Sequence, residues 1–201
     1  DIKRGTVDAG SRVLESGSIP TRAGEGPERA AARVRAWFED HGAGERAEAV
    51  GVACAGLIDG ASGMLHVSPN LDGWVDVALR DCFARELRAP VSVENDANAA
   101  AYGEWRAGAG RGLENFVCLT LGTGVGGGII LNGALYRGST GFAGEIGHAV
   151  IRADGPLCAC GNRGCLEALI GASAIVRRAR EIYEAAGKRI AEGDAGLSVE
   201  R

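Results

Sequence analysis

Residues 116–131 read FVCLTLGTGVGGGIIL, two apolar runs joined by a segment that holds five glycines. We expect a β-strand on each side and a glycine-rich turn over residues 122–128. Because glycine has no Cβ, backbone N–H groups in such a turn can approach an anion closely, which predicts a phosphate-binding loop at Gly122, Thr123 and Gly124. No Lys-Ser/Thr pair follows the glycines, so the pattern differs from a Walker loop. A strand and not a helix is expected next, so it also differs from a dinucleotide-binding fingerprint. A glycine-rich hairpin without a ligand is the alternative.

Apolar patterns of strand and helix type alternate on both sides of this stretch. The Asn-Gly pair at 132–133 is a strong signal for a β-hairpin, and apolar residues at helical spacing predict helices over residues 27–41 and 173–186. A hairpin with a glycine-containing turn is expected in each half, at residues 2–14 and 128–136. The alternation predicts an α/β class, and the two hairpins indicate a duplicated core.

The chain holds further apolar segments between these elements. We expect a buried strand at residues 49–54, a loop at 55–60, and a second strand at 91–94 that runs into an Ala-rich helix. Another strand is expected to begin at residues 150–151. One more helix is predicted from the spacing of Val77, Leu79, Phe83 and Leu87.

Composition excludes several classes of protein. The 201 residues are 46% hydrophobic and 24% charged, with 33 glycines and a net charge of −4. These proportions exclude general disorder, and so many glycines disfavour a helical bundle. No apolar run approaches the ~20 residues of a membrane span, and no basic-apolar leader is visible. We therefore expect a cytoplasmic protein whose partners are neither membranes nor nucleic acids.

Three of the six cysteines lie within eight residues and follow one of the three histidines. His148, Cys158, Cys160 and Cys165 supply one imidazole and three thiolates, which are the four tetrahedral ligands of a closed structural zinc site. Two glycines between the last cysteines allow the tight bend that such a site needs. Because no secretory leader is visible, a metal site is favoured over a disulfide framework. The alternative is a set of cysteines unrelated to the histidine.

The strand expected at 91–94 ends in residues 94–98, which read ENDAN. Ligands of open α/β sheets gather at the carboxyl ends of the strands. A carboxylate between two amides suits a polyhydroxyl ligand, because amides donate and accept hydrogen bonds and Asp96 can accept a hydroxyl proton. The alternative is an N-cap cluster for the next helix, where Asp and Asn are favoured.

Two glutamates lie close in sequence to the expected metal ligands, Glu145 before His148 and Glu167 after Cys165. A zinc ion that joins His148 to Cys165 would bring both carboxylates into one neighbourhood. Glutamates that simply face solvent are the alternative.

Together these motifs resemble the ROK family (repressor, ORF, kinase) of bacterial sugar kinases and related repressors, within the actin/hexokinase superfamily. The resemblance runs over nearly the whole chain. It rests on ENDANAA at 94–100, LGTGVGGG at 121–128, GEIGH at 144–148 and CACGNRGCLE at 158–167. It implies an α/β, two-domain fold of the actin-like ATPase or ribonuclease H-like kind, with a duplicated strand–hairpin–helix core.

The resemblance also implies where the domains lie. A smaller N-terminal α/β domain is expected over residues 1–97 and a larger C-terminal α/β domain over residues 98–201, with the zinc-binding loop at 144–167. The family's first phosphate motif, Asp-x-Gly-Gly-Thr, has no counterpart after Asp1, and its adenosine-binding part has none after Arg201. We therefore expect a chain that is incomplete at both places.

The roles that the resemblance implies fall on the residues already singled out. Asp96 is implied as the catalytic base that takes the proton of the sugar's primary hydroxyl. Thr123 and Gly124 are implied as part of the ATP phosphate loop, and the four metal ligands as a zinc site. The implied sugar contacts are Gly56, Asn70, Asn95, Asp96, Glu145, His148 and Glu167.

The implied reaction is ATP-dependent phosphorylation of a hexose at its 6-hydroxyl, with Mg²⁺ and with glucose as the first expectation. Kinases of N-acetylmannosamine, N-acetylglucosamine or fructose are alternatives, and polyphosphate is an alternative phosphoryl donor. A sugar-responsive repressor is a further alternative, although no winged helix-turn-helix is visible and the catalytic motifs are present. The family implies a homodimer or higher homo-oligomer. Loss of zinc is expected to weaken sugar binding more than nucleotide binding.

Overall fold

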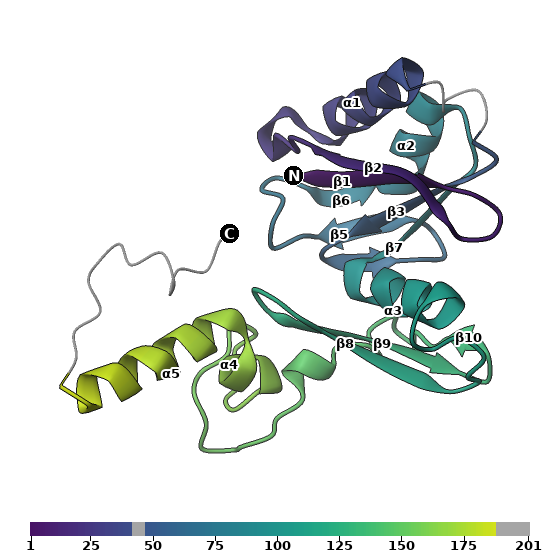
Figure 1. Cartoon of the computed structure of the whole chain (residues 1–201). Coiled ribbons are helices and arrows are strands. Elements are labelled where there is room, and N and C mark those ends of the chain that lie inside the picture. Colours follow the sequence, from purple (N-terminus) through teal and green to yellow (C-terminus); the bar gives the residue numbers. More distant parts are fainter. Residues whose placement is uncertain (42–46, 188–201) are drawn as a thin grey trace. The chain divides into compact units, whose positions relative to one another are not determined.

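The computed structural model describes residues 1–41 and 47–187. The chain divides into two compact units, Asp1–Ala99 and Ala100–Arg201, and the division falls inside helix α3 (Asp96–Ala107). Figure 1 shows strands and helices in both units. The domain boundary implied by the resemblance stays a prediction.

The first unit begins with the hairpin that the sequence predicts. Strands β1 (Ile2–Val7) and β2 (Val13–Ile19) are antiparallel. Asp8 holds the turn between them, because its Oδ1 accepts the backbone N–H of Gly10 at 3.0 Å and of Arg12 at 2.9 Å. The second strand is longer than predicted, because its polar and mostly exposed residues hide the period of a strand.

A parallel pair of strands confirms the two strands expected at residues 49–54 and 91–94. β3 (Val50–Cys54) pairs with β7 (Val91–Asn95) along its whole length. Helices α1 (Pro27–Asp40) and α2 (Leu79–Leu87) pack against each other, and α1 begins at a proline, which suits the first helical position because no N–H is needed there. The buried core of this unit joins both helices to the strands through Ala30, Ala31, Val34, Leu65, Leu79, Phe83, Val91 and Val93.

A separate antiparallel sheet departs from the sequence prediction. It consists of β4 (Leu57–Asp59), β5 (Met64–Val67) and β6 (Val75–Ala78), in that order. The loop predicted after β3 therefore contains a strand, which is too short to show an alternating pattern. Val77, whose spacing assigned it to the following helix, instead lies in β6 opposite Leu65.

The second unit is built on the stretch that opened the sequence analysis. β8 (Phe116–Leu121), β9 (Val125–Leu131) and β10 (Ala134–Leu135) form an antiparallel sheet in the order β10-β9-β8. The hairpin predicted at the Asn-Gly pair is confirmed. Asn132 and Gly133 have φ angles of 50° and 72°, as a type I′ turn requires.

The glycine-rich turn between β8 and β9 is shorter than predicted. Only residues 122–124 separate the strands, whereas Gly126, Gly127 and Gly128 lie within β9 and pair with β8. A Cβ on Gly127 would lie 2.8 Å from the carbonyl oxygen of Gly144. The missing side chain therefore lets a later segment pack directly on the sheet, and three of the five glycines do not belong to the turn.

The remaining elements of this unit are a 3-10 helix η2 (Ile146–His148) and two helices, α4 (Leu166–Ile170) and α5 (Ala172–Ala185). Helix α5 confirms the last helix predicted from sequence. The strand expected after η2 is only an isolated bridge between Val150 and Cys165, because the next two N–H groups donate to the same carbonyl oxygen and no ladder continues. In the part of the chain that the structure describes, no helix is long and apolar enough to cross a membrane.

Candidate functional site

Asn95 forms the junction at which β7 runs directly into α3. The parallel pairing of β7 with β3 places Asn95 beside Cys54. Asn95 Oδ1 accepts the backbone N–H groups of Ala97 at 2.9 Å and of Asn98 at 3.1 Å. These are the bonds of an N-cap residue. The N-cap alternative for this cluster is therefore confirmed for Asn95.

Asp96 is the first residue of α3, and its side chain is exposed. Its Oδ1 accepts the backbone N–H of Ala97 at 3.0 Å, and Oδ2 has no hydrogen-bond or ion-pair partner among the residues that the structure describes. Asp96 therefore presents a carboxylate oxygen that can accept a hydrogen bond and a proton from a ligand.

The thiol of Cys54, at the end of β3, stays neutral next to this carboxylate. Burial, and after it the negative charge of Asp96, raise the pKa of the Cys54 thiol to about 11. Its Sγ donates to the carbonyl oxygen of Ala55 at 3.5 Å. At neutral pH the Cys54 thiol therefore keeps its proton.

The same Asn95 side chain holds the loop that follows β3. Asn95 Nδ2 donates to the carbonyl oxygen of Gly56 at 3.2 Å. Gly56 has a φ of 129°, and a Cβ there would clash with the carbonyl oxygen of Val67 and lie 2.9 Å from Ser68 Cα. The backbone conformation and close packing at position 56 thus require glycine. Asn95 still has the second N–H of its amide, which it can donate to a ligand.

We expect Gly56→Ala to lower the free energy of unfolding by about 1–3 kcal/mol, because the variant joins an unfavourable φ to a backbone clash. The matched control is Gly51→Ala in β3, where a Cβ would meet nothing within 4 Å. Urea unfolding followed by circular dichroism measures both variants. Equal midpoints for the two would contradict the packing of this loop.

Asn70 lies in the exposed turn after β5. Its backbone N–H donates to Ser68 Oγ at 3.3 Å, and within the described residues its side chain has no hydrogen-bond partner. Because Ser68 lies against Gly56, the turn that carries Asn70 is beside the loop to which Asn95 is bonded. The structure thus gathers three of the predicted sugar contacts of the first unit.

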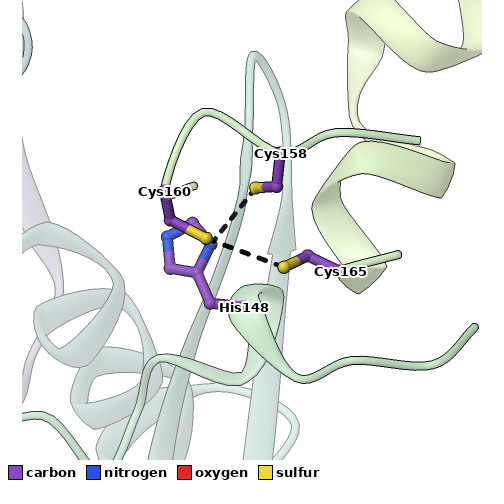
Figure 2. Close-up of side chains that lie close together, drawn as sticks. All are labelled: His148, Cys158, Cys160 and Cys165. Carbon is purple, nitrogen blue, oxygen red and sulfur yellow. Dashed lines mark hydrogen bonds between the residues drawn. The ribbon is translucent and has the colours of Figure 1, made fainter. Parts of the chain in front are cut away.

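In the second unit, the structure brings together His148, Cys158, Cys160 and Cys165, as Figure 2 shows. Their ligand atoms all lie within 4.8 Å of one another. His148 Nδ1 is 3.6 Å from Cys158 Sγ, and Cys160 Sγ is 3.7 Å from Cys165 Sγ. Zinc bonds of about 2.3 Å to sulfur and about 2.0 Å to nitrogen, at tetrahedral angles, give ligand separations of about 3.5–3.8 Å. The chemistry of the four donors suits a tetrahedral zinc ion, and these two separations match its geometry.

The backbone around this cluster explains why distant residues meet. The N–H of Leu166 donates to the carbonyl oxygen of Ala149 at 3.0 Å, which joins the segment after His148 to helix α4. Gly164 has a φ of 70°, and a Cβ there would clash with the carbonyl oxygen of Arg152. Only glycine allows this close approach, so the glycine is part of the framework of the cluster.

The thiols of the cluster differ in acidity. The backbone N–H of Asn162, which donates to Cys160, lowers the pKa of the exposed Cys160 thiol. Burial, and then hydrogen bonds with Cys160 and Cys158, raise the pKa of the Cys165 thiol to about 12. A metal that binds here as a thiolate complex must therefore displace the proton of Cys165.

Both predicted glutamates lie at the cluster, but they make different contacts. Glu145 is exposed, and its Oε2 is 3.8 Å from His148 Nε2, so the imidazole has one nitrogen toward Cys158 and the other toward a carboxylate. Glu167 Oε2 accepts the backbone N–H of Val125 at 2.9 Å, and Glu167 Oε1 is 3.9 Å from Cys158 Sγ. No sequence feature predicts the bond to Val125. The proposed role of Glu167 as a sugar ligand stays a prediction.

The shortened turn carries the predicted phosphate contacts Gly122, Thr123 and Gly124. Gly122 N–H donates to the carbonyl oxygen of Gly124 at 3.0 Å, and Ala172 N–H donates to that of Gly122 at 3.1 Å. Gly122 and Thr123 are exposed. The turn therefore presents the Thr123 hydroxyl and its backbone to solvent, where they can contact an anion. Ala172, the first residue of α5, supports the turn through its hydrogen bond to Gly122.

A family model described as ROK family matches residues 8–195. The chain belongs to the ROK family. The α/β fold of the ROK sugar kinases, which is that of the actin-like ATPases, is confirmed by solved relatives.

Three relatives show how far the similarity of this ROK chain extends. A glucokinase from Thermotoga maritima is 41% identical over 180 residues, which are 90% of this chain and 57% of that protein. A glucokinase from Streptomyces coelicolor is 38% identical over 188 residues, 94% of this chain and 58% of that protein. The crystal structure of a ROK glucokinase from Streptomyces griseus, in complex with glucose and AMPPNP, matches with a TM-score of 0.74 and 40% identity, over 91% of this chain and 58% of that one. The chain thus spans 57–58% of the length of these relatives.

Proposed function

We propose that this ROK chain is part of a kinase that transfers phosphate from ATP to the 6-hydroxyl of a hexose, and that the hexose is glucose. The observation that carries the proposal is the exposed Asp96 carboxylate at the carboxyl end of β7, whose Oδ2 is available to a ligand. Glucokinase relatives at 38–41% identity over nine-tenths of the chain support the choice of sugar.

In the proposed reaction, Asp96 Oδ2 accepts the proton of the 6-hydroxyl while the hydroxyl oxygen attacks the γ-phosphorus. The new P–O bond forms as the bond from the γ-phosphorus to the β,γ-bridging oxygen breaks, and ADP leaves. Phosphoryl transfer depends mostly on positioning and charge stabilisation, and general-base help contributes about 10²–10⁴-fold. Mg²⁺ bound to the nucleotide would neutralise phosphate charge.

The proposed phosphate contacts lie on the turn at residues 122–124. Thr123 and Gly124 bind phosphate oxygens through their backbone N–H groups and the Thr123 hydroxyl. Gly122, whose own N–H donates to the carbonyl oxygen of Gly124, lets a phosphate approach the turn because it has no Cβ. Hydroxyl groups of the sugar are bound by Asn70, Asn95, Glu145, His148 and Glu167. His148 Nδ1 and the thiolates of Cys158, Cys160 and Cys165 hold one Zn²⁺, which orders the loop that carries these contacts.

Glucose is expected to have a kcat/KM about tenfold or more above that of mannose, fructose, N-acetylglucosamine and N-acetylmannosamine, because a site built to bond particular hydroxyls rejects sugars in which one is replaced or points in another direction. A coupled assay over this sugar panel, run with ATP and with polyphosphate as donor, measures the preference. A higher kcat/KM for one of the other sugars would replace glucose in the proposal. Sugar binding without phosphorylation of any of them would favour the repressor alternative.

A cytoplasmic location, a place in glycolysis and assembly into a homodimer or larger homo-oligomer are proposed from the family relationship. Light scattering after size-exclusion chromatography measures the assembly. A mass equal to that of one chain would overturn the proposed assembly into a homo-oligomer.

A further inference from the structure

Helix α4 connects the Cys/His cluster to the glycine turn at residues 122–124. Cys165, one of the cluster ligands, lies directly before the helix. Directly after it, Ala172 N–H donates to the carbonyl oxygen of Gly122 at 3.1 Å. Movement of the cluster end of this five-residue helix would therefore be transmitted to the turn.

Glu167, on the first turn of α4, makes the second link. Its Oε2 accepts the N–H of Val125, the residue that follows the turn, at 2.9 Å, and its Oε1 lies 3.9 Å from Cys158 Sγ. Gly124 makes room for this carboxylate, because a Cβ on Gly124 would clash with Glu167 Oε2 and lie 3.2 Å from its Cδ. One side chain thus contacts both a cluster ligand and the end of the turn.

Val125 is also held from the histidine side of the cluster. It is 5% exposed, and a Cβ on Gly147 would clash with its carbonyl oxygen. Gly147 directly precedes His148 in η2. The backbone of Val125 is therefore in contact with both of the segments that a metal ion would tie together.

We propose that metal binding at the Cys/His cluster positions the glycine turn through Glu167, so that occupancy of the cluster and nucleotide affinity are coupled. Glu167 is then a positioning residue for the turn. The inference rests on the proposed function only for the identity of the ligand at the turn. It differs from the expectation drawn from sequence, in which metal loss mainly weakens sugar binding.

Amide hydrogen exchange at Val125, measured by NMR on the full chain, tests the mechanical part without any nucleotide. We expect Glu167→Ala, Gly124→Ala and Cys160→Ser each to speed this exchange about tenfold or more, because each loosens a charge-assisted hydrogen bond. Gly124→Ala moves the carboxylate while every metal ligand stays in place. Glu167→Gln keeps an acceptor oxygen and is expected to retain most of the protection. The matched control is Gly103→Ala in α3, where a Cβ meets nothing within 4 Å.

Calorimetric titration with AMPPNP and Mg²⁺ tests the coupling itself. Cys160→Ser is expected to raise the Kd about fivefold or more, a typical size for coupling between two sites. In the Glu167→Ala background the same substitution is expected to change the Kd less than twofold, which a double-mutant cycle reports directly. Cys118→Ser, outside the cluster, is the control for the loss of a thiol.

Two results would overturn the proposal: unchanged exchange at Val125 in Cys160→Ser and Gly124→Ala, or an equal effect of Cys160→Ser on the Kd with and without Glu167. Failure of the proposed function looks different. In that case AMPPNP binds no form of the protein, yet the exchange measurements still decide whether the cluster holds the turn through Glu167.

Discussion

Asp96→Asn is expected to lower kcat for hexose phosphorylation by about 10²–10⁴-fold, the usual contribution of a general base. The amide oxygen of Asn can still accept the N–H of Ala97, as Oδ1 does at 3.0 Å, so the start of α3 should stay intact. What is lost is an oxygen that can take a proton. Sugar KM and nucleotide affinity are therefore expected to change much less than kcat, and steady-state kinetics with glucose separates the two.

Asp81→Asn is the matched control for this experiment. Asp81 lies in the first turn of α2, as Asp96 does in that of α3, and its side chain is 68% exposed. Its exposed ion pair with Arg80 contributes little, so kcat should not change. Near-normal turnover of the Asp96→Asn enzyme would show that another group accepts the proton.

Cys160→Ser is expected to reduce bound zinc from about one ion per chain to nearly none, because a serine hydroxyl does not replace a thiolate in a tetrahedral zinc site. Cys160 is exposed, so the substitution leaves no cavity in the core. Since binding free energy at a structural site is also folding free energy, we expect the melting temperature to fall by about 5 °C or more. Elemental analysis and differential scanning fluorimetry measure the two effects.

Cys118→Ser serves as the control for this second experiment. Cys118 lies in β8 and is half-buried, and it takes no part in the Cys/His cluster. The Cys118→Ser variant should retain about one zinc per chain. Full zinc content in Cys160→Ser would remove the metal site from the proposal, whereas loss of zinc in both variants would point to a general loss of structure.

Elements with a strong local signal could be predicted from the sequence. Helices α1 and α5 follow apolar residues at helical spacing, β3 is a compact apolar run, β7 begins with two valines in alternation, and the Asn-Gly pair marks the turn before β10. The sheet β4-β5-β6 could not be predicted in this way. Its first strand has three residues, so the pairing with β5, and not its own pattern, determines that it is a strand.

The candidate site, too, could be predicted from the sequence only in part. The Cys/His cluster was predicted because ligand type and number are written in the sequence, and the chain folds so that His148 reaches three cysteines beyond a bend. The contacts of Glu167 with Val125 and of Gly147 against the same residue join segments that lie far apart in sequence. No local feature of the sequence predicts such contacts, because a glutamate is written the same way whether its carboxylate accepts a backbone N–H or faces solvent.

The sequence by itself determined the family, the α/β class and the chemical character of each group: a carboxylate between two amides, four metal ligands and a glycine-rich turn. Only the tertiary structure decided how these groups are used. It assigned three of the five glycines to β9, made Asn95 an N-cap with Asp96 exposed beside it, and bonded Glu167 to the end of the turn. The physical reason is that residue type sets which interactions are possible, whereas the packing of segments distant in sequence selects which of them form.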